Sequence, residues 1–203
     1  MNDFEAQLPA LIDALAHTGW VVCDDFLSQD QATALRAEGL RRQQQGEFHR
    51  AAVGRADARA QRDEIRGDDV RWLDPLQPSD PEHAYWQRIN ALQSGLNHEL
   101  FLGIREGEFH YAHYPVGSFY KRHLDRFRDD DARVVSVVCY LNSDWQAHDG
   151  GQLRLWHDPD QADHYTDIAP QAGRLVLFLS ERYWHEVLPA QQPRWSITGW
   201  MRR

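Results

Sequence analysis

The sequence predicts a mainly β fold with supporting α-helices, in a single domain that spans all 203 residues. Apolar residues recur at helical spacing through about the first hundred positions, whereas short β-rich runs separated by Gly, Pro, Asn and Asp follow from Phe109 onward. No linker or low-complexity tract separates the two halves. We therefore expect helices from about 1–104 to support one face of an antiparallel β sandwich or barrel built from about 105–203.

Three helices are expected in the first half. The first covers about 3–16, where apolar residues form one stripe. The second begins after Ser28, which forms a capping box with Gln31 three residues later. The third begins at Asp80, because Pro81 suits the first helical position.

The strands are expected mainly in the second half. The segment Arg50–Leu76 is rich in charge and Gly, lacks sustained periodicity, and predicts a long loop with one short strand. The β-rich runs that follow are Phe109–Tyr114, Val134–Leu141, Gln152–Trp156, Leu175–Leu179 and Trp195–Met201.

The charge balance argues against nucleic acid as a ligand. Lys and Arg number 22 against 31 Asp and Glu, a formal charge of −9, which repels phosphates. No apolar run is long enough to cross a membrane, and no signal peptide is indicated. The two cysteines, Cys23 and Cys139, are expected to be reduced thiols. These features predict a cytoplasmic protein.

Two histidines and one carboxylate form a candidate metal site. His123 and Asp125 have the i, i+2 spacing that places side chains on the same face of a strand. His185 follows the run Leu175–Leu179, so a second strand end delivers another imidazole. Two His and one carboxylate make the facial triad of non-haem Fe(II). The alternatives are a solvated polar pair for the first two and a loop residue for His185.

The last strand carries a candidate anion-binding cation, Arg194. Alternation puts Arg194, Ser196, Thr198 and Trp200 on one face, opposite Trp195, Ile197, Gly199 and Met201. An inward guanidinium needs an anion, and the neighbouring strands offer no obvious carboxylate, so a ligand carboxylate is expected. The alternative is an outward Arg194 on a sheet edge. Tyr140 would face the same interior, with Val138 and Ser136.

Taken together, these segments resemble the 2-oxoglutarate and Fe(II)-dependent prolyl 4-hydroxylases, above all the oxygen-sensing, hypoxia-type branch, and suggest a bacterial homologue. The likeness covers about 105–201. It is carried by Tyr114-Pro115 through Tyr120, Arg122-His123-Leu124-Asp125, Tyr140-Leu141-Asn142-Ser143-Asp144-Trp145, Gly150-Gly151-Gln152-Leu153-Arg154, and His185-Glu186-Val187 with Arg194 nine positions later. Collagen-type members have lysine where Arg194 stands. The family fold is a double-stranded β-helix, a cupin-like jelly roll supported by helices.

The resemblance implies a role for each matching residue. His123, Asp125 and His185 match the iron ligands, and Arg194 matches the partner of the distal carboxylate of 2-oxoglutarate. Tyr140 and Thr198 match hydroxyls that support that carboxylate. The remaining matches are Tyr114, near the iron-chelating end of the cosubstrate, and three residues of the pocket wall, Leu153, Val187 and Trp200.

The resemblance also implies a reaction and a substrate. Oxygen, Fe(II) and 2-oxoglutarate, with ascorbate as an optional reductant, would hydroxylate proline in an extended or loop segment of a partner protein, a regulator or a component of translation. Ile65-Arg66-Gly67-Asp68 and Trp72 resemble the family's substrate loop, and Arg62 lies just before them. We expect 55–72 to be a mobile lid, because it is long, charged and without apolar periodicity.

Three alternatives remain. An oxygenase of the same fold could act on a free amino acid or other small molecule, which the long charged loop disfavours. A nucleic acid demethylase is disfavoured by the −9 charge. A catalytically silent metal-binding jelly-roll module would keep the fold but need not keep Arg194 beside a complete triad. A monomer is expected, and oxygen sensing is an expected role.

Overall fold

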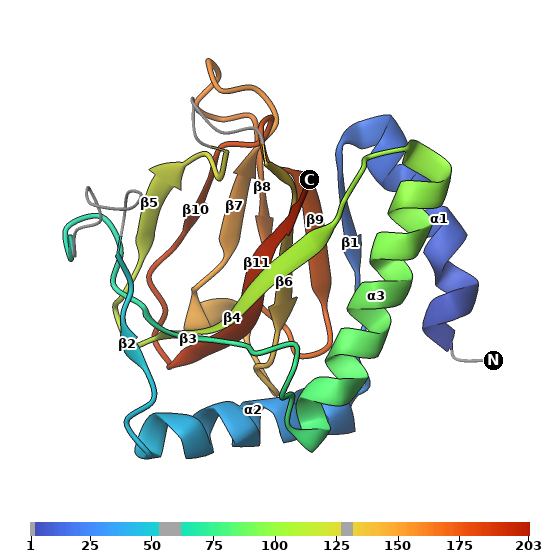
Figure 1. Ribbon diagram of the computed structural model, residues 1–203. Coiled ribbons are helices and arrows are strands. Elements are labelled where there is room, and N and C mark those ends of the chain that lie inside the picture. The colour runs from blue at the N-terminus through green and yellow to red at the C-terminus, as the bar shows by residue number, and fades with distance from the viewer. Residues whose placement is uncertain (1–2, 53–61, 127–131) are drawn as a thin grey trace.

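The computed structural model describes residues 3–52, 62–126 and 132–203, which fold into two antiparallel β-sheets flanked by three α-helices (Figure 1). The helices are α1 (Asp3–Thr18), α2 (Gln29–Gln44) and α3 (Asp80–Leu100). The expected helices are confirmed. Ser28 and Gln31 form both bonds of the capping box of α2, and Pro81 lies in the first turn of α3.

The larger sheet has seven strands in the order β1-β9-β6-β11-β4-β3-β2. They are β1 (Trp20–Cys23), β2 (His49–Arg50), β3 (Asp69–Trp72), β4 (Glu106–Tyr114), β6 (Arg133–Tyr140), β9 (Leu175–Leu179) and β11 (Arg194–Arg202). The smaller sheet has four strands in the order β5-β10-β7-β8: β5 (Tyr120–His123), β7 (Leu153–Trp156), β8 (Tyr165–Ile168) and β10 (His185–Val187). A jelly-roll core is thus confirmed.

The expected boundary near residue 104 is wrong in one respect, because three strands of the larger sheet come from the first half of the chain. β1 extends one edge of this sheet by pairing with β9, and β2 and β3 extend the other edge beside β4. These strands have two to four residues each. Such short segments show no period of their own, and pairing with distant strands stabilises them.

The two faces of the larger sheet have different partners. Its outer face packs on the helices, where α1 and α3 lie side by side and α2 crosses near one end of the sheet (Figure 1). Trp195, Ile197 and Met201 of β11 belong to this helix-facing core. Its inner face meets the smaller sheet through a second apolar cluster that includes Tyr140, Leu153 and Val187. The predicted alternation along β11 is confirmed.

The expected long loop is built into the sheet over its last part. Val70 of β3 is buried, and β3 pairs with β4 along its whole length. Before β3, Gly67 donates its backbone N–H to the Phe119 carbonyl, and Asp68 is fully buried. Within the expected mobile lid, 55–72, main-chain pairing therefore holds residues 67–72 in place where apolar periodicity is absent. The expected lid residues 55–61 lie outside the described part of the chain.

No described helix combines the length and apolarity needed to span a bilayer. Cys23 and Cys139 are both buried, free thiols, as expected.

Candidate active site

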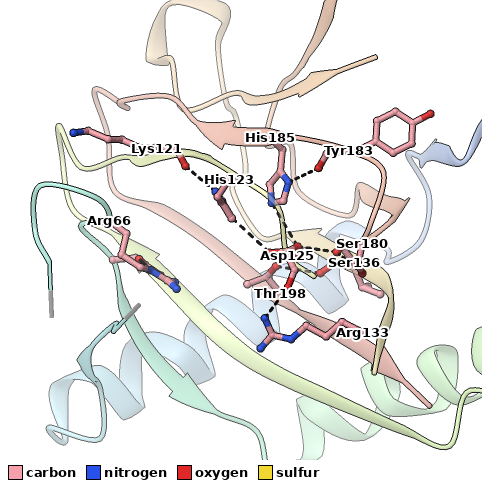
Figure 2. Close-up of polar contacts among 12 residues, drawn as sticks. Arg66, Lys121, His123, Asp125, Arg133, Ser136, Ser180, Tyr183, His185 and Thr198 are labelled. Atoms are coloured by element: carbon pink, nitrogen blue, oxygen red, sulfur yellow. Dashed lines mark hydrogen bonds and ion pairs between the residues drawn. The ribbon is translucent and has the colours of Figure 1, made fainter. Parts of the chain in front are cut away.

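His123, Asp125 and His185 converge between the two sheets (Figure 2). One donor atom from each of the three lies within 4.8 Å of the others. The Nε2 atom of His123 is 3.5 Å from one carboxylate oxygen of Asp125, and Nε2 of His185 is 3.5 Å from the other. The predicted convergence of these three side chains is confirmed.

Their origins differ from those expected. His123 ends β5, but Asp125 lies in the bend that follows, so strand alternation does not bring the two together. His185 begins β10 in the smaller sheet, instead of ending the β9 strand of the larger one. The two histidines are register partners on adjacent strands, with ring centroids 4.2 Å apart.

Hydrogen bonds to backbone carbonyls set the orientation of both imidazoles. Nδ1 of His123 lies 2.7 Å from the Lys121 carbonyl, and Nδ1 of His185 lies 3.0 Å from the Tyr183 carbonyl. A carbonyl only accepts, so Nδ1 carries the proton and Nε2 keeps a free lone pair. Burial and the neighbouring His123 lower the pKa of His185 to about 4. At neutral pH its ring therefore has the uncharged form that binds metals.

The Asp125 carboxylate is buried and held from behind by hydroxyls (Figure 2). Ser136 Oγ donates to it at 2.7 Å, and Ser180 Oγ lies 2.9 Å from Ser136 Oγ. Burial alone would raise the pKa of Asp125, but the two imidazoles and Ser136 together hold it well below its usual range. The site thus presents two imidazoles and one ionised carboxylate, the donor set that suits Fe(II).

A cavity between the sheets, here called the inner cavity, extends from this triad to Arg194. Six of the residues predicted to contact the cosubstrate line it: Tyr114, Leu153, Val187, Arg194, Thr198 and Trp200. Their convergence follows from the register, since Arg194 pairs with Tyr114 across β11 and β4, whereas Leu153 and Val187 pair on the smaller sheet.

Arg194 is 1% exposed and has no ion-pair partner among the described residues. Its Nε donates to the Gly151 carbonyl at 2.9 Å, and its Cζ lies 5.1 and 5.0 Å from the ring centroids of Tyr114 and Tyr140. A buried guanidinium without an acid is costly unless a ligand provides one. The cavity therefore fits a ligand with a carboxylate at the Arg194 end and metal-chelating oxygens at the triad.

The two hydroxyls expected to support that carboxylate differ in what they can donate. The Tyr140 hydroxyl is buried and has no hydrogen-bond partner among the described residues, so its proton is available to a ligand. Burial raises the pKa of Tyr140 to about 12, which keeps it protonated. Thr198 Oγ1 already donates to the Val137 carbonyl at 3.1 Å. In this rotamer Thr198 can only accept, and the support it was predicted to give stays a prediction.

A second cavity of about 290 Å³, here called the outer cavity, adjoins the inner one and shares His123 and Asp125 with it. Ile65, Arg66 and Trp72 of the predicted substrate segment line it. Gly67 and Asp68 are buried behind this wall, where Asp68 pairs with Arg66 through two bonds of 2.7 and 2.5 Å. The sixth predicted residue, Arg62, is exposed and lines neither cavity.

No role is predicted from the sequence for three residues of this site. His110 lines both cavities, and Tyr120 stacks on His123 with ring centroids 3.6 Å apart. Arg133 lies over the Trp200 ring and donates to the backbone carbonyl of Asp125 (Figure 2). Alternation along Phe109–Tyr114 would have placed His110 on the face of Tyr114. No local pattern marks the other two.

Comparisons with known proteins agree with this site. The family model described as the 2OG-Fe(II) oxygenase superfamily matches residues 109–202. A Pseudomonas putida prolyl-4-hydroxylase structure has a TM-score of 0.86 and 45% identity, covering 97% of this chain and 100% of that one. A Trichoplax adhaerens prolyl hydroxylase, in complex with a hypoxia inducible factor oxygen degradation domain peptide, has a TM-score of 0.85 and 29% identity, covering 98% and 90%.

Among curated proteins, Egl nine homolog 1 of Mus musculus is 31% identical over 212 residues, which cover 95% of this chain. The match spans 50% of that protein, so this chain corresponds to about half of its length. The Caenorhabditis elegans hypoxia-inducible factor prolyl hydroxylase is 32% identical over 94% of this chain. With the triad and Arg194 in place, this chain belongs to the 2OG-Fe(II) oxygenase superfamily, among its prolyl hydroxylases.

Proposed function

We propose that this chain hydroxylates a prolyl residue of a protein substrate, using 2-oxoglutarate and oxygen and giving 4-hydroxyproline, succinate and carbon dioxide. The observation that carries the proposal is the inner cavity. One end holds the buried Arg194 guanidinium, which pairs with no acid in the described part of the chain, and the other end holds the donor set of two histidines and one carboxylate. The 45% identity to a prolyl-4-hydroxylase supports proline as the target.

Each part of the site has a task in this reaction. His123, Asp125 and His185 would hold Fe(II), which when bound supplies the oxidative chemistry that couples decarboxylation of 2-oxoglutarate to hydroxylation. Arg194 and Tyr140 would bind the distal carboxylate of 2-oxoglutarate, and Tyr114 would lie along its length.

The residues that contact the triad fix its geometry, and those along the cavity wall exclude water. Ser136 fixes the Asp125 carboxylate, and the backbone carbonyls of Lys121 and Tyr183 fix the two imidazoles. Leu153 and Val187 provide apolar walls, which keep water away from the reacting atoms.

The outer cavity would receive the target proline. Ile65, Arg66 and Trp72 form one wall of it and would contact the peptide, with Gly67 and Asp68 fixing Arg66 and its loop from behind. Arg62, on the exposed side, would contact flanking residues of the substrate. A protein substrate is supported by the likeness to the Trichoplax enzyme, whose structure contains a peptide.

The domain organisation, location and substrate class of the enzyme are also proposed. The 203 residues would act as one oxygenase domain in a cytoplasmic monomer, with ascorbate as an optional reductant and no nucleic acid partner. A regulator or a component of translation would be the substrate, and oxygen sensing the role.

The decisive experiment compares the proteome of a host with and without the gene. Mass spectrometry should find a proline that gains the mass of one oxygen atom only when the gene is present, and fragmentation should assign it to C4. The Asp125→Ala variant is the matched control and should leave that proline unmodified. A proteome without any gene-dependent prolyl hydroxylation would refute the proposal. Turnover of a free amino acid would then favour the small-molecule oxygenase, and absence of turnover the silent metal-binding module.

A further inference from the structure

His110 is a buried polar side chain for which the site described above has no use. It lies in the middle of β4 and is 2% exposed. Neither Nδ1 nor Nε2 has a hydrogen-bond partner among the described residues. Buried polar atoms are nearly always paired in native proteins, so an unpaired imidazole calls for a partner from outside the chain.

The register of the sheet places His110 at the junction of the two cavities. It pairs with Trp72 of β3 on one side and with Thr198 of β11 on the other. Its ring packs beside two indoles, with centroid distances of 4.6 Å to Trp72 and 5.8 Å to Trp200, and the two indoles lie 6.5 Å from each other. It is part of the wall of both the inner and the outer cavity.

The surroundings keep this imidazole uncharged. Burial, followed by the nearby Arg66, lowers the pKa of His110 to about 3. A neutral imidazole has one N–H donor and one acceptor nitrogen. This combination matches a peptide backbone, which offers a carbonyl and an N–H, better than it matches a carboxylate, which only accepts.

Position along the strand separates His110 from the cosubstrate carboxylate. Arg194 pairs with Tyr114, four residues from His110 on β4, which corresponds to about 13 Å between strand positions. The two carboxylates of 2-oxoglutarate are joined by four carbon–carbon bonds of about 1.5 Å, a span of about 5 Å. His110 therefore lies toward the opposite end of the site from the Arg194 carboxylate pocket, where the outer cavity begins.

We propose that His110 binds the substrate polypeptide, donating a hydrogen bond from its imidazole N–H to a backbone carbonyl beside the target proline. This assignment rests on the proposed function. His110 would then be a substrate-binding and specificity residue, with the rings of Trp72 and Trp200 packed beside it. Among the described residues, the unpaired Tyr85 hydroxyl, in contrast, lies in the helix-facing core and lines neither cavity, whereas the unpaired indole N–H of Trp200 belongs to the same cavity walls as His110.

Two substitutions test the hydrogen bond apart from the packing. His110→Phe keeps an aromatic ring and removes both nitrogens, whereas His110→Gln keeps one donor and one acceptor group. His113→Phe is the matched control, because His113 lies on the same strand but on the opposite face, where its ring packs against Trp195 and contacts Gln43.

The protein substrate is a lysate from a host strain that lacks the gene, so that target prolines are unmodified. Each variant is added with Fe(II) and 2-oxoglutarate, and hydroxylation of each peptide is followed by mass spectrometry. A separate measurement records the rise in melting temperature when 2-oxoglutarate is added in the presence of Mn(II), which reports cosubstrate binding without turnover.

Loss of one neutral hydrogen bond to substrate should slow hydroxylation by His110→Phe about tenfold. The melting-temperature rise with Mn(II) and 2-oxoglutarate should remain within about twofold of wild type. His110→Gln should recover most of the rate, and His113→Phe should match wild type.

Wild-type hydroxylation rates in His110→Phe would overturn the assignment. So would an equal loss of the 2-oxoglutarate response, because His110 would then serve the cosubstrate or the fold. If wild-type protein binds Mn(II) and 2-oxoglutarate but hydroxylates no protein, the proposed function itself fails, and the assignment falls with it.

Discussion

Replacing Arg194 with methionine removes the cation of the inner cavity and keeps most of the side-chain volume. The guanidinium is 1% exposed, bonded to the Gly151 carbonyl through Nε, and without an acid among the described residues. Its remaining N–H groups are therefore free for a ligand carboxylate. Because charge-assisted bonds contribute roughly 1.5–3 kcal/mol each, losing this contact should weaken 2-oxoglutarate binding about 100-fold.

This loss can be measured without turnover. At a 2-oxoglutarate concentration about 100 times the wild-type Kd, with Mn(II) present, binding stabilises the wild type by about 2.7 kcal/mol. A 100-fold weaker Kd reduces that figure to about 0.4 kcal/mol. For a chain of this length the rise in Tm should fall from roughly 5–11 °C to about 1 °C.

Without 2-oxoglutarate, Arg194→Met should be nearly as stable as the wild type. Methionine removes an uncompensated buried charge, which offsets the lost bond to Gly151, so unfolding free energy should stay within about 1 kcal/mol of wild type. Arg194→Lys keeps the charge but not the planar fork and should recover part of the response. Arg154→Met is the control, since Arg154 pairs with Asp167 away from the inner cavity. An unchanged 2-oxoglutarate response in Arg194→Met would refute the reasoning.

Three further predictions concern the supports of the site and one helix. Ser136→Ala removes the hydroxyl that donates to Asp125, and it should weaken Mn(II) binding about 10-fold or more, as measured by calorimetry. Unchanged Mn(II) affinity would mean that Asp125 does not need this hydrogen bond. Gly151→Ala adds a Cβ to a residue with φ +66°, and this Cβ would lie 3.2 Å from Arg194 Cδ. The variant should therefore have a lower Tm and a lower affinity for 2-oxoglutarate. If both values stay at the wild-type level, the contact does not matter. Glu38 has a pKa lowered to about 2 by its bonds to Arg41, against burial, so its stabilisation is complete above about pH 4.5 and disappears as pH falls toward 2. In urea unfolding, Glu38→Gln should lower the free energy of unfolding by about 1–2 kcal/mol at pH 7, a figure reduced because Arg41 is half exposed. Near pH 2 the substitution should lower it by almost nothing. A loss of stability that does not change with pH would show that the ion pair is not its cause.

The sequence by itself determined the helices, the long strands and the chemistry of the site. Alternation along β11 is local information, because adjacent side chains must take opposite faces. It therefore placed Arg194 and Trp195 on opposite faces before any pairing was known, and the structure shows Arg194 in the inner cavity and Trp195 in the helix-facing core. Residue type and spacing made His123, Asp125 and His185 candidates for a facial triad, and the family resemblance assigned them to iron.

Tertiary structure decided how these residues meet. His185 reaches His123 because β10 pairs with β5, and Asp125 is placed by a bend and by Ser136, a residue 11 positions along the chain. The short strands β1, β2 and β3, and with them the wall formed by Trp72 and His110, exist only through pairing with distant strands. Segments of two to four residues are too short to show a period, and their stability comes from partners that local sequence does not name.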